Sequence, residues 1–170
     1  MNSSRRSIWV GFRQRLATSL IQDFYPEGMP DDWRNNYLVM MTSAVWIADT
    51  DADAADALAA VADAPKPVLA VLERGAGAAQ SPFTDWLVDH ADLPVIRLAP
   101  DEALWRPDAA ASGCRVGLIP AQDQPKLLRT WIESFIAQAP EVPCALFVDG
   151  DQPSVPTMER LQTLVELMGL

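Results

Sequence analysis

The sequence contains few of the residues that most often carry catalysis and metal binding. Its 170 residues include one histidine, His90, and two cysteines, Cys114 and Cys144. One histidine and two distant cysteines do not make a zinc site of the usual four-ligand kind. A Ser–His–Asp hydrolase on a nucleophile elbow needs a Gly-x-Ser-x-Gly turn, which does not occur in the sequence. We therefore expect no metal and no cofactor, and His90 is expected to interact with the carboxyl end of a helix.

The sequence also lacks long apolar runs and cysteine pairs. No run approaches the ~18 apolar residues that a membrane span requires. The apolar stretch 8–12 is shorter than the ~7–15 residues of a signal-peptide core, and Arg13 follows it directly. Each cysteine begins an apolar run, which favours reduced thiols in a core over a disulfide. These features predict a cytoplasmic protein that does not enter a membrane.

Positive charge is scarce relative to negative charge. There are 13 Lys and Arg residues against 23 Asp and Glu residues, so the net charge is −10. A field of that sign repels phosphates, which excludes a generic nucleic-acid-binding protein. A hydrophobic content of 49% and this length suit one domain with a real core. We expect a single α/β domain over residues 1–170.

Six short runs are continuously apolar, which is typical of parallel strands covered by helices on both faces. Amphipathic stretches alternate with them, and this order predicts an α/β fold of about six parallel β/α units. Ser154 is expected to cap the last helix, and Pro125 to lie in the first turn of the preceding one. The predicted strands are residues 8–12, 44–48, 68–72, 95–98, 116–119 and 144–148; the predicted helices include 53–63, one starting at Ser81, 127–136 and 158–168.

The segment Phe24-Tyr25-Pro26-Glu27-Gly28 is the most distinctive of the chain. With Trp9-Val10-Gly11 before it and Trp33 after it, it resembles the YecE-like family of uncharacterised proteins. Residues 94–170 are similar to the same family, through a Leu-x-x-Trp helix (Leu128 to Trp131) and a strand that ends in polar residues. The resemblance implies a (β/α)8-barrel ancestry and no established activity.

The chain departs from that family in two ways. A (β/α)8 barrel typically has about 250 residues, so the resemblance implies a shortened, divergent member that is either TIM-barrel-like or an open doubly wound sheet. The family's Val-Glu-Ile-Asn signature is replaced by Val45-Trp46-Ile47-Ala48, and its Arg-x-His-Gly pattern by residues 116–120, which hold no basic group. A site built on those family residues is therefore absent. An incomplete barrel also leaves strand edges uncovered, which predicts self-association.

Carboxylates follow two of the predicted strands. Asp149 and Asp151 come after the last strand, where ligands bind in α/β folds and where an Asp-x-Asp pair could hold Mg²⁺. A turn with helix-dipole charge is the favoured interpretation. Asp49, Asp51 and Asp53 begin like a calcium loop, but the sixth position is alanine and the twelfth lacks glutamate, so charge at a helix amino terminus is favoured there as well.

A glycine-containing turn and the six tryptophans are the remaining candidates for a binding site. Gly75-Ala76-Gly77 follows a strand, but the third glycine of a dinucleotide-binding turn is missing, so a loop is favoured. Aromatic side chains at a pocket rim or interface supply binding energy. Trp46, Trp86 and Trp131 are predicted to be in the core, and Trp9, Trp33 and Trp105 to be partly exposed.

Together these features favour a non-catalytic binding or protein-interaction module. The expected partners are a second copy of the chain and either a protein or a small anionic ligand, with a ligand site drawn from Asp149, Asp151, Asp49, Trp9 and Trp33. The alternative is a metal-dependent hydrolase or phosphotransferase that acts on a small phosphorylated molecule through Asp149 and Asp151. The two hypotheses differ in whether Asp49 and Asp149 converge in one cleft.

Overall fold

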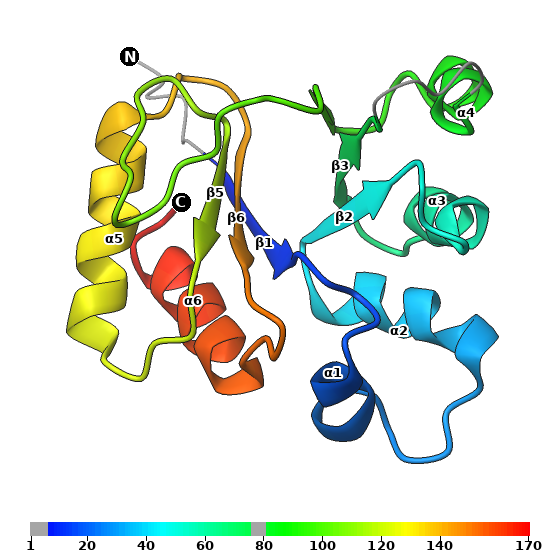
Figure 1. Ribbon diagram of the computed structural model, residues 1–170, viewed down its shortest axis with the longest axis horizontal. Helices are drawn as coiled ribbons and strands as arrows, with labels where there is room; N and C mark the ends of the chain where they lie inside the picture. The colour runs from blue at the N-terminus through cyan, green and yellow to red at the C-terminus, as the bar shows by residue number, and fades with distance from the viewer. Residues whose placement is uncertain (1–6, 76–80) are drawn as a thin grey trace.

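The computed structural model describes residues 7–75 and 81–170 and contains two three-stranded parallel sheets (Figure 1). The strand order is β1-β6-β5 in one sheet and β2-β3-β4 in the other. The prediction of an α/β fold with six parallel strands is confirmed, and only the third strand is displaced, by one residue. The strands are β1 Ile8–Phe12, β2 Ala44–Ala48, β3 Leu69–Glu73, β4 Val95–Leu98, β5 Val116–Ile119 and β6 Cys144–Val148.

The two sheets meet where β1 lies beside β2. The side-chain oxygen of Ser43 accepts a hydrogen bond from the Val10 N–H at 2.8 Å, and the Ser43 N–H donates to the Val10 carbonyl at 3.0 Å. Through this junction the strands lie in the spatial order β5-β6-β1-β2-β3-β4. Gly11, on β1, lies so close to β2 that a Cβ atom there would overlap the Ala44 carbonyl oxygen.

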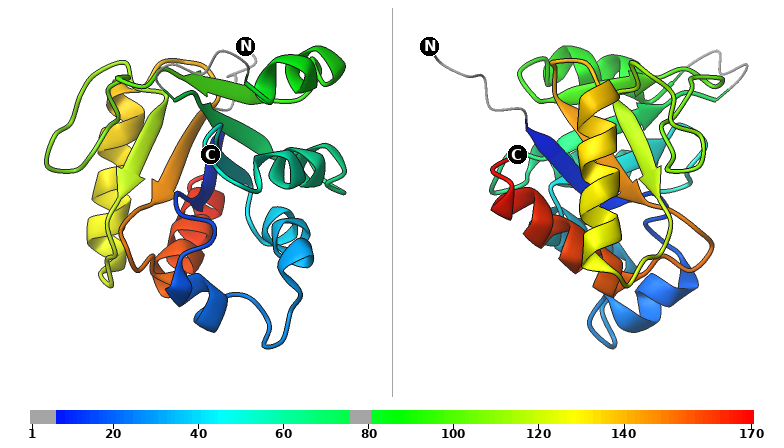
Figure 2. Two further views of the ribbon diagram at one scale, coloured as in Figure 1. Left: turned by 45° about the vertical axis from the view of Figure 1, so that its right-hand side comes forward. Right: turned by 90° about the vertical axis from the view of Figure 1, so that its left-hand side faces the viewer.

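Helices α5 and α6 cover the outer side of the β1-β6-β5 sheet, and α2, α3 and α4 lie on the side of the other sheet (Figures 1 and 2). Ser154 caps α6 by accepting the Thr157 N–H at 3.2 Å, and Pro125 is the first residue of α5, both as predicted. No helix in the described part of the chain is long and apolar enough to span a membrane. The helices are α1 Thr18–Asp23, η1 Asp31–Trp33, α2 Arg34–Met41, α3 Ala54–Ala62, α4 Phe83–Asp89, α5 Pro125–Gln138 and α6 Val155–Leu167.

The connection between β4 and β5 departs from the predicted strand–helix alternation. Residues 99–115, all of which are described, contain turns and isolated bridges and no helix. Trp105 lies along β5, where its N–H donates to the Val116 carbonyl and its carbonyl accepts from the Leu118 N–H. Its ring is fully buried and contacts Phe135, so the prediction that Trp105 is partly exposed is wrong. Its backbone forms hydrogen bonds along the edge of β5, and its ring packs into the core against α5.

Alternate residues of the strands face two separate cores, as the pleat of a β-strand requires. One core lies between the strands and the helices and includes Val10, Val45 and Leu146. The other is built from side chains of β2 to β6, with Trp9 of β1 packed against it, and a ring contact between Trp46 and Phe147 at 5.2 Å joins the two sheets within it. This inner core comprises Ala44, Trp46, Leu69, Val71, Ile96, Leu98, Val116, Leu118, Ala145 and Phe147, with Trp9 and Leu104 packed against it.

Other sequence predictions concern single side chains. Cys114 and Cys144 are both buried, as expected for core thiols, and burial raises the pKa of the Cys114 thiol. Trp46 and Trp86 are buried as predicted, whereas Trp131 is only half-buried against the core. His90 ends α4, where its ring stacks on Trp86 and its Nδ1 lies 2.9 Å from the Trp86 carbonyl, so its expected place at a helix end is confirmed.

The Phe24–Tyr25 segment packs against the end of β1. The Phe24 ring contacts Phe12, the last residue of β1, at 5.2 Å, and it also contacts Tyr25 and Tyr37. The Tyr25 hydroxyl donates to the Arg15 carbonyl at 2.9 Å. Burial raises the pKa of Tyr25 to about 12, so this hydroxyl stays protonated and remains a donor at neutral pH. The segment therefore fixes the position of residues 12–15, which form the end of β1 and the start of the loop after it.

Candidate ligand site at the carboxyl ends of the strands

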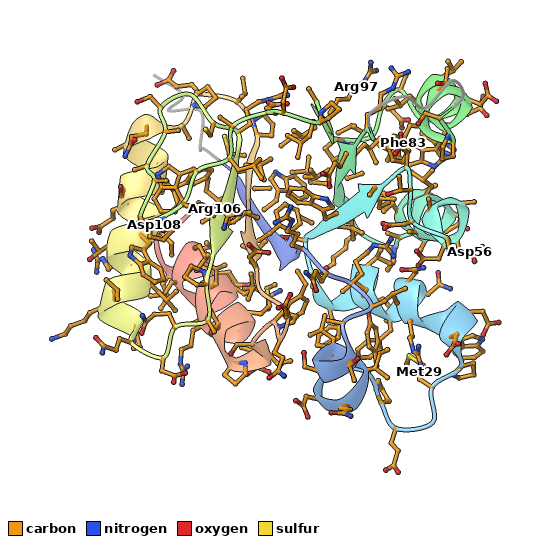
Figure 3. All side chains as sticks on the ribbon, in the orientation of Figure 1. Met29, Asp56, Phe83, Arg97, Arg106 and Asp108 are labelled. Atoms are coloured by element: carbon orange, nitrogen blue, oxygen red, sulfur yellow. The ribbon has the colours of Figure 1, made fainter. Side chains whose placement is uncertain are left out.

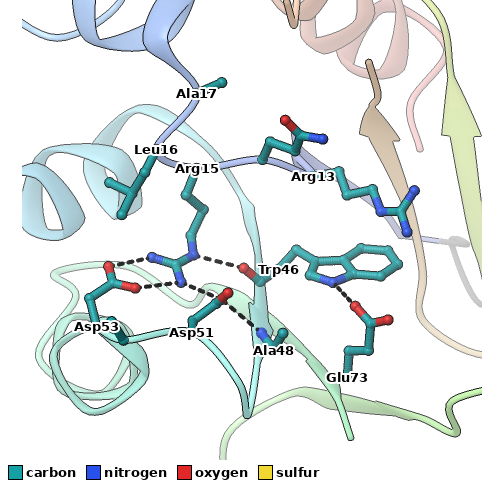
Figure 4. Close-up of a pocket in the computed structure, with 11 residues that line it drawn as sticks. Arg13, Arg15, Leu16, Ala17, Trp46, Ala48, Asp51, Asp53 and Glu73 are labelled. Carbon is teal, nitrogen blue, oxygen red and sulfur yellow. Dashed lines mark hydrogen bonds and ion pairs between the residues drawn. The ribbon is translucent and has the colours of Figure 1, made fainter. Parts of the chain in front are cut away.

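A cavity of about 550 Å³ lies where β1, β2 and β3 end (Figure 4). Ligands bind at this end of the strands in open and closed parallel folds. The chain after β1 supplies one wall, the end of β2 with the turn into α3 supplies another, and Glu73 closes the end of β3. The residues that line the cavity are Arg13, Gln14, Arg15, Leu16, Ala17, Trp46, Ala48, Asp51, Ala52, Asp53 and Glu73.

Arg15 is buried beneath this cavity and binds four groups. Its Nη1 and Nη2 donate to the two carboxylate oxygens of Asp53 at 2.8 and 3.1 Å, a two-point ion pair. Its Nη2 also donates to Asp51 at 2.8 Å. Its Nε donates to the Trp46 carbonyl and its Nη1 to the Asn35 side chain, at 2.8 and 2.9 Å. With its side chain only 3% exposed, Arg15 joins β1, β2, α2 and the start of α3.

The charges of this network shift the pKa of its members. Burial by itself would raise the pKa of the Asp53 carboxyl, but hydrogen bonds from Arg15 and Asn35 and the charge of Arg15 hold that pKa below its usual value. Burial would likewise lower the pKa of Arg15, and the two aspartates outweigh it, so the pKa of Arg15 is raised. Both groups are therefore ionised at neutral pH.

Asp51 and Asp53 precede α3, and Asp53 is its N-cap residue, as expected for charge at a helix amino terminus, although its side chain makes no hydrogen bond that caps the helix. Their partner is Arg15, and Asp51 additionally accepts the Ala48 N–H at 2.9 Å. The two carboxylates therefore serve the buried guanidinium of Arg15 as well as the start of α3.

Trp46 forms the floor between two charged side chains. Its indole N–H donates to Glu73 at 2.7 Å, and the guanidinium carbon of Arg13 lies 5.1 Å from the centre of its ring (Figure 4). That distance is within the range of a cation–π contact. Phe147 makes a T-shaped contact with the same indole ring. Arg13 is thus placed over Trp46 at the border of the cavity.

Arg13 also reaches the end of β6, where Asp149 lies. Its Nη1 is 3.4 Å from Asp149 Oδ1, and Arg106 Nη1 is 3.2 Å from Asp149 Oδ2. Asp149 and Arg106 line a second cavity, of about 350 Å³, with Trp131 and Asp108; Figure 3 shows Arg106 and Asp108 beside β5. The Arg13–Asp149–Arg106 triad therefore stands between the two cavities.

The remaining predicted site residues are not brought together. Asp49 lines neither of these two cavities; its Oδ1 accepts the Gly75 N–H at 2.8 Å. Asp151 is exposed in the turn before α6. Trp9 is half-buried against the inner core, and Trp33 is 63% exposed on η1. Of the predicted set, Asp149 alone is at the candidate site.

Two further sequence features, a possible metal site and the Gly75-Ala76-Gly77 turn, can be compared with the described part of the chain. Among residues 7–75 and 81–170, no group of three or more His, Cys, Asp and Glu side chains is arranged to hold a metal ion. In the Gly75-Ala76-Gly77 turn, Ala76 and Gly77 lie outside the described residues, whereas the Gly75 N–H binds Asp49.

Sequence reasoning missed Arg13, Arg15 and Arg106, which form most of the site. A signal was present for two of them, because Arg13 and Arg15 directly follow an apolar strand at the end where parallel folds bind ligands. For Arg106 no such signal exists, since it follows no strand. Comparison of the chain with models of protein families, with curated proteins and with solved structures finds no match.

Proposed function

We propose that this protein is a non-catalytic binding module that receives a small anionic ligand at the carboxyl ends of its strands. One observation carries the proposal: Arg13 and Arg106, which are 31% and 43% exposed, converge on a single carboxylate between two cavities. The two guanidinium groups share Asp149 as a counter-ion, although other carboxylates, those of Asp51, Asp53, Glu73 and Asp108, also line the two cavities. Two guanidinium groups that converge on one position favour an anionic group there.

We further propose that the fold is a shortened, barrel-like arrangement related to the YecE-like family. The spatial order of the strands follows their sequence apart from the β6–β1 neighbour pair, as in a barrel whose last strand lies beside its first. The shared inner core also supports a barrel, because in TIM barrels inward-facing side chains from all strands fill the centre. A doubly wound sheet would instead reverse its strand order at a switch point.

The arrangement of the acidic groups supports binding over metal-dependent hydrolysis. Asp149 is engaged by two arginines, and Asp151 lies exposed in the turn before α6, so the Asp-x-Asp pair does not present both carboxylates to one ion. Calorimetry with Mg²⁺ separates the two hypotheses. We expect no binding heat at millimolar Mg²⁺; heat that Asp149→Asn abolishes would establish the metal-dependent alternative.

A cavity-filling variant tests the binding function. Ala52 lines the larger cavity and is exposed, so Ala52→Trp blocks that cavity without disturbing the core. Ala59→Trp is the matched control, since Ala59 is exposed on α3 and does not line that cavity. In ligand-observed NMR with a set of small organic acids and phosphate esters, we expect binding to the wild type and to Ala59→Trp and loss of binding in Ala52→Trp. Equal binding by all three proteins, or by none, contradicts the proposal.

We also retain self-association as a proposal, with a second copy of the chain as the partner. It is supported by large apolar side chains that are exposed along η1 and α2: Trp33 is 63%, Met40 59% and Met41 48% exposed. Exposed aromatic and methionine side chains are enriched at protein interfaces. We therefore propose that the contact between the two copies lies on this surface.

A further inference from the structure

We infer that Asp149 is an exchangeable internal counter-ion, and that the carboxylate of an organic acid takes its place between Arg13 and Arg106. The inference rests on the proposed binding function and names its ligand class. Two arginines that follow β1, Arg13 and Arg15, differ in how they bind their counter-ions. Arg15 makes ion pairs of 2.8 Å and is 3% exposed, whereas Arg13 approaches Asp149 no closer than 3.4 Å and is 31% exposed.

The lengths of these contacts separate fixed ion pairs from loose ones. Charge-assisted N–H···O bonds are usually about 2.7–2.9 Å long, as in the Arg15 network. The contacts of Asp149 with Arg13 and Arg106, at 3.4 and 3.2 Å, are longer, and each uses one nitrogen of the guanidinium. The arginines of both pairs are partly exposed, although the Asp149 side chain is only 16% exposed, and long ion pairs near the surface contribute less to stability than short ones. A competing anion therefore displaces Asp149 at little cost.

The backbone at all three positions is held independently of the ion pairs. The Arg13 N–H donates to the Val148 carbonyl at 3.1 Å, and the Asp149 N–H donates to the Ile119 carbonyl at 2.9 Å. Arg106 is anchored by a bridge to Ala109 and follows Trp105, which is bonded to β5. The side chains can thus change rotamer without disturbing the sheet. This arrangement presents two cations on a rigid frame, which reduces the ordering cost of binding.

The surrounding charges favour a carboxylate over a phosphate. The position between the two arginines already holds a carboxylate, that of Asp149, so its geometry suits this group. Glu73 and Asp51 line the same cavity as Arg13 and would repel a dianion more strongly than a monoanion. Because the cavity of about 550 Å³ is far larger than one carboxylate group, it has room for the rest of an organic acid.

The test uses acetate as the probe and the Trp46 indole N–H as the reporter. Arg13 lies over this ring, so its movement shifts the indole resonance, which Trp46→Phe assigns. At constant ionic strength, we expect a saturable shift with acetate in two-dimensional NMR. In Asp149→Asn, which removes the competing charge, acetate affinity should rise by about fivefold. Arg13→Gln should abolish the shift in both backgrounds, and Arg160→Gln, at an exposed ion pair on α6, should leave it unchanged.

The outcomes distinguish this inference from the proposed function. Unchanged or weaker acetate binding in Asp149→Asn overturns the exchange role of Asp149. Tighter binding of inorganic phosphate than of acetate overturns the carboxylate class. If Ala52→Trp blocks the organic acids while Arg13→Gln and Asp149→Asn have no effect, the binding function stands and only this inference fails. Arg13 is partly exposed, and the backbone at Asp149 is held by its own hydrogen bond to Ile119, so we expect these variants to fold; circular dichroism verifies it.

Discussion

Arg15 and Asp53 form a two-point ion pair, with Nη1···Oδ2 and Nη2···Oδ1 distances of 2.8 and 3.1 Å, across 38 residues of sequence. The pair joins the segment after β1 to the start of α3. Because Arg15 also binds the Trp46 carbonyl, it fixes the ends of β1 and β2 relative to one another. This network forms the base of the candidate ligand site, so loss of the network should affect the fold before it affects binding.

Removal of the Arg15 side chain should strongly destabilise the protein. Arg15→Ala leaves Asp51, Asp53 and the Trp46 carbonyl without their cation, and breaking a buried pair by removing one partner costs about 3–5 kcal/mol. Urea unfolding measures the change in free energy of unfolding. Arg160→Ala, at an exposed pair with Asp123, should change it by less than about 0.5 kcal/mol. Similar losses in both variants would contradict a structural role for Arg15.

The lowered pKa of Asp53 predicts a loss of stability in acid. Since the folded state holds the proton less tightly than the unfolded chain, ionised Asp53 stabilises the fold above the ordinary aspartate pKa of about 3.9. That contribution is lost as pH falls from this value through the lower folded-state pKa. Chemical unfolding across this pH range should show the loss in the wild type and a smaller slope in Asp53→Asn. An equal slope in both proteins would assign the acid sensitivity to other carboxylates.

Substitution of Gly11 should be costly because of close packing rather than backbone conformation. A methyl group at Gly11 overlaps the Ala44 carbonyl oxygen and comes within 2.9 Å of the Phe147 ring. Overpacking of a core typically costs about 1–3 kcal/mol, and the rigid carbonyl places Gly11→Ala at or above the upper end of that range. Gly169→Ala is the comparison, since Gly169 has φ of 71° and open space around it. A smaller loss for Gly11→Ala than for Gly169→Ala would contradict the close approach of β1 and β2.

The exposed apolar surface on η1 and α2 predicts a dimer. Size-exclusion chromatography with light scattering should show the dimer mass at micromolar concentrations, and the double variant Trp33→Ser, Met40→Ser should shift it to the monomer because it removes apolar contact area. Val88→Ser, at a position 75% exposed on α4, should leave the dimer intact. A wild type that stays monomeric throughout this range would remove the proposal.

The secondary structure was predictable because its signals are local. Runs such as Cys144–Val148 are continuously apolar over the length of one strand, and Ser154 stands at the helix start that it caps. Both features depend on residues that are neighbours in sequence. The predicted alternation of strands and helices does not hold between β4 and β5 for the opposite reason, since Trp105 occupies the edge of β5 through contacts that no local pattern encodes.

The sequence by itself determined the six strands, their parallel α/β class and the polar residues at the strand ends. Only the tertiary structure decided which charges meet. Arg13 and Asp149 are 136 residues apart, and they become partners because β1 pairs with β6. Asp49 directly follows the neighbouring strand β2, but its side chain accepts a hydrogen bond from the Gly75 N–H instead of joining this site. Strand formation follows from local side-chain patterns, whereas ion-pair choice follows from strand pairing and burial, which place distant residues together.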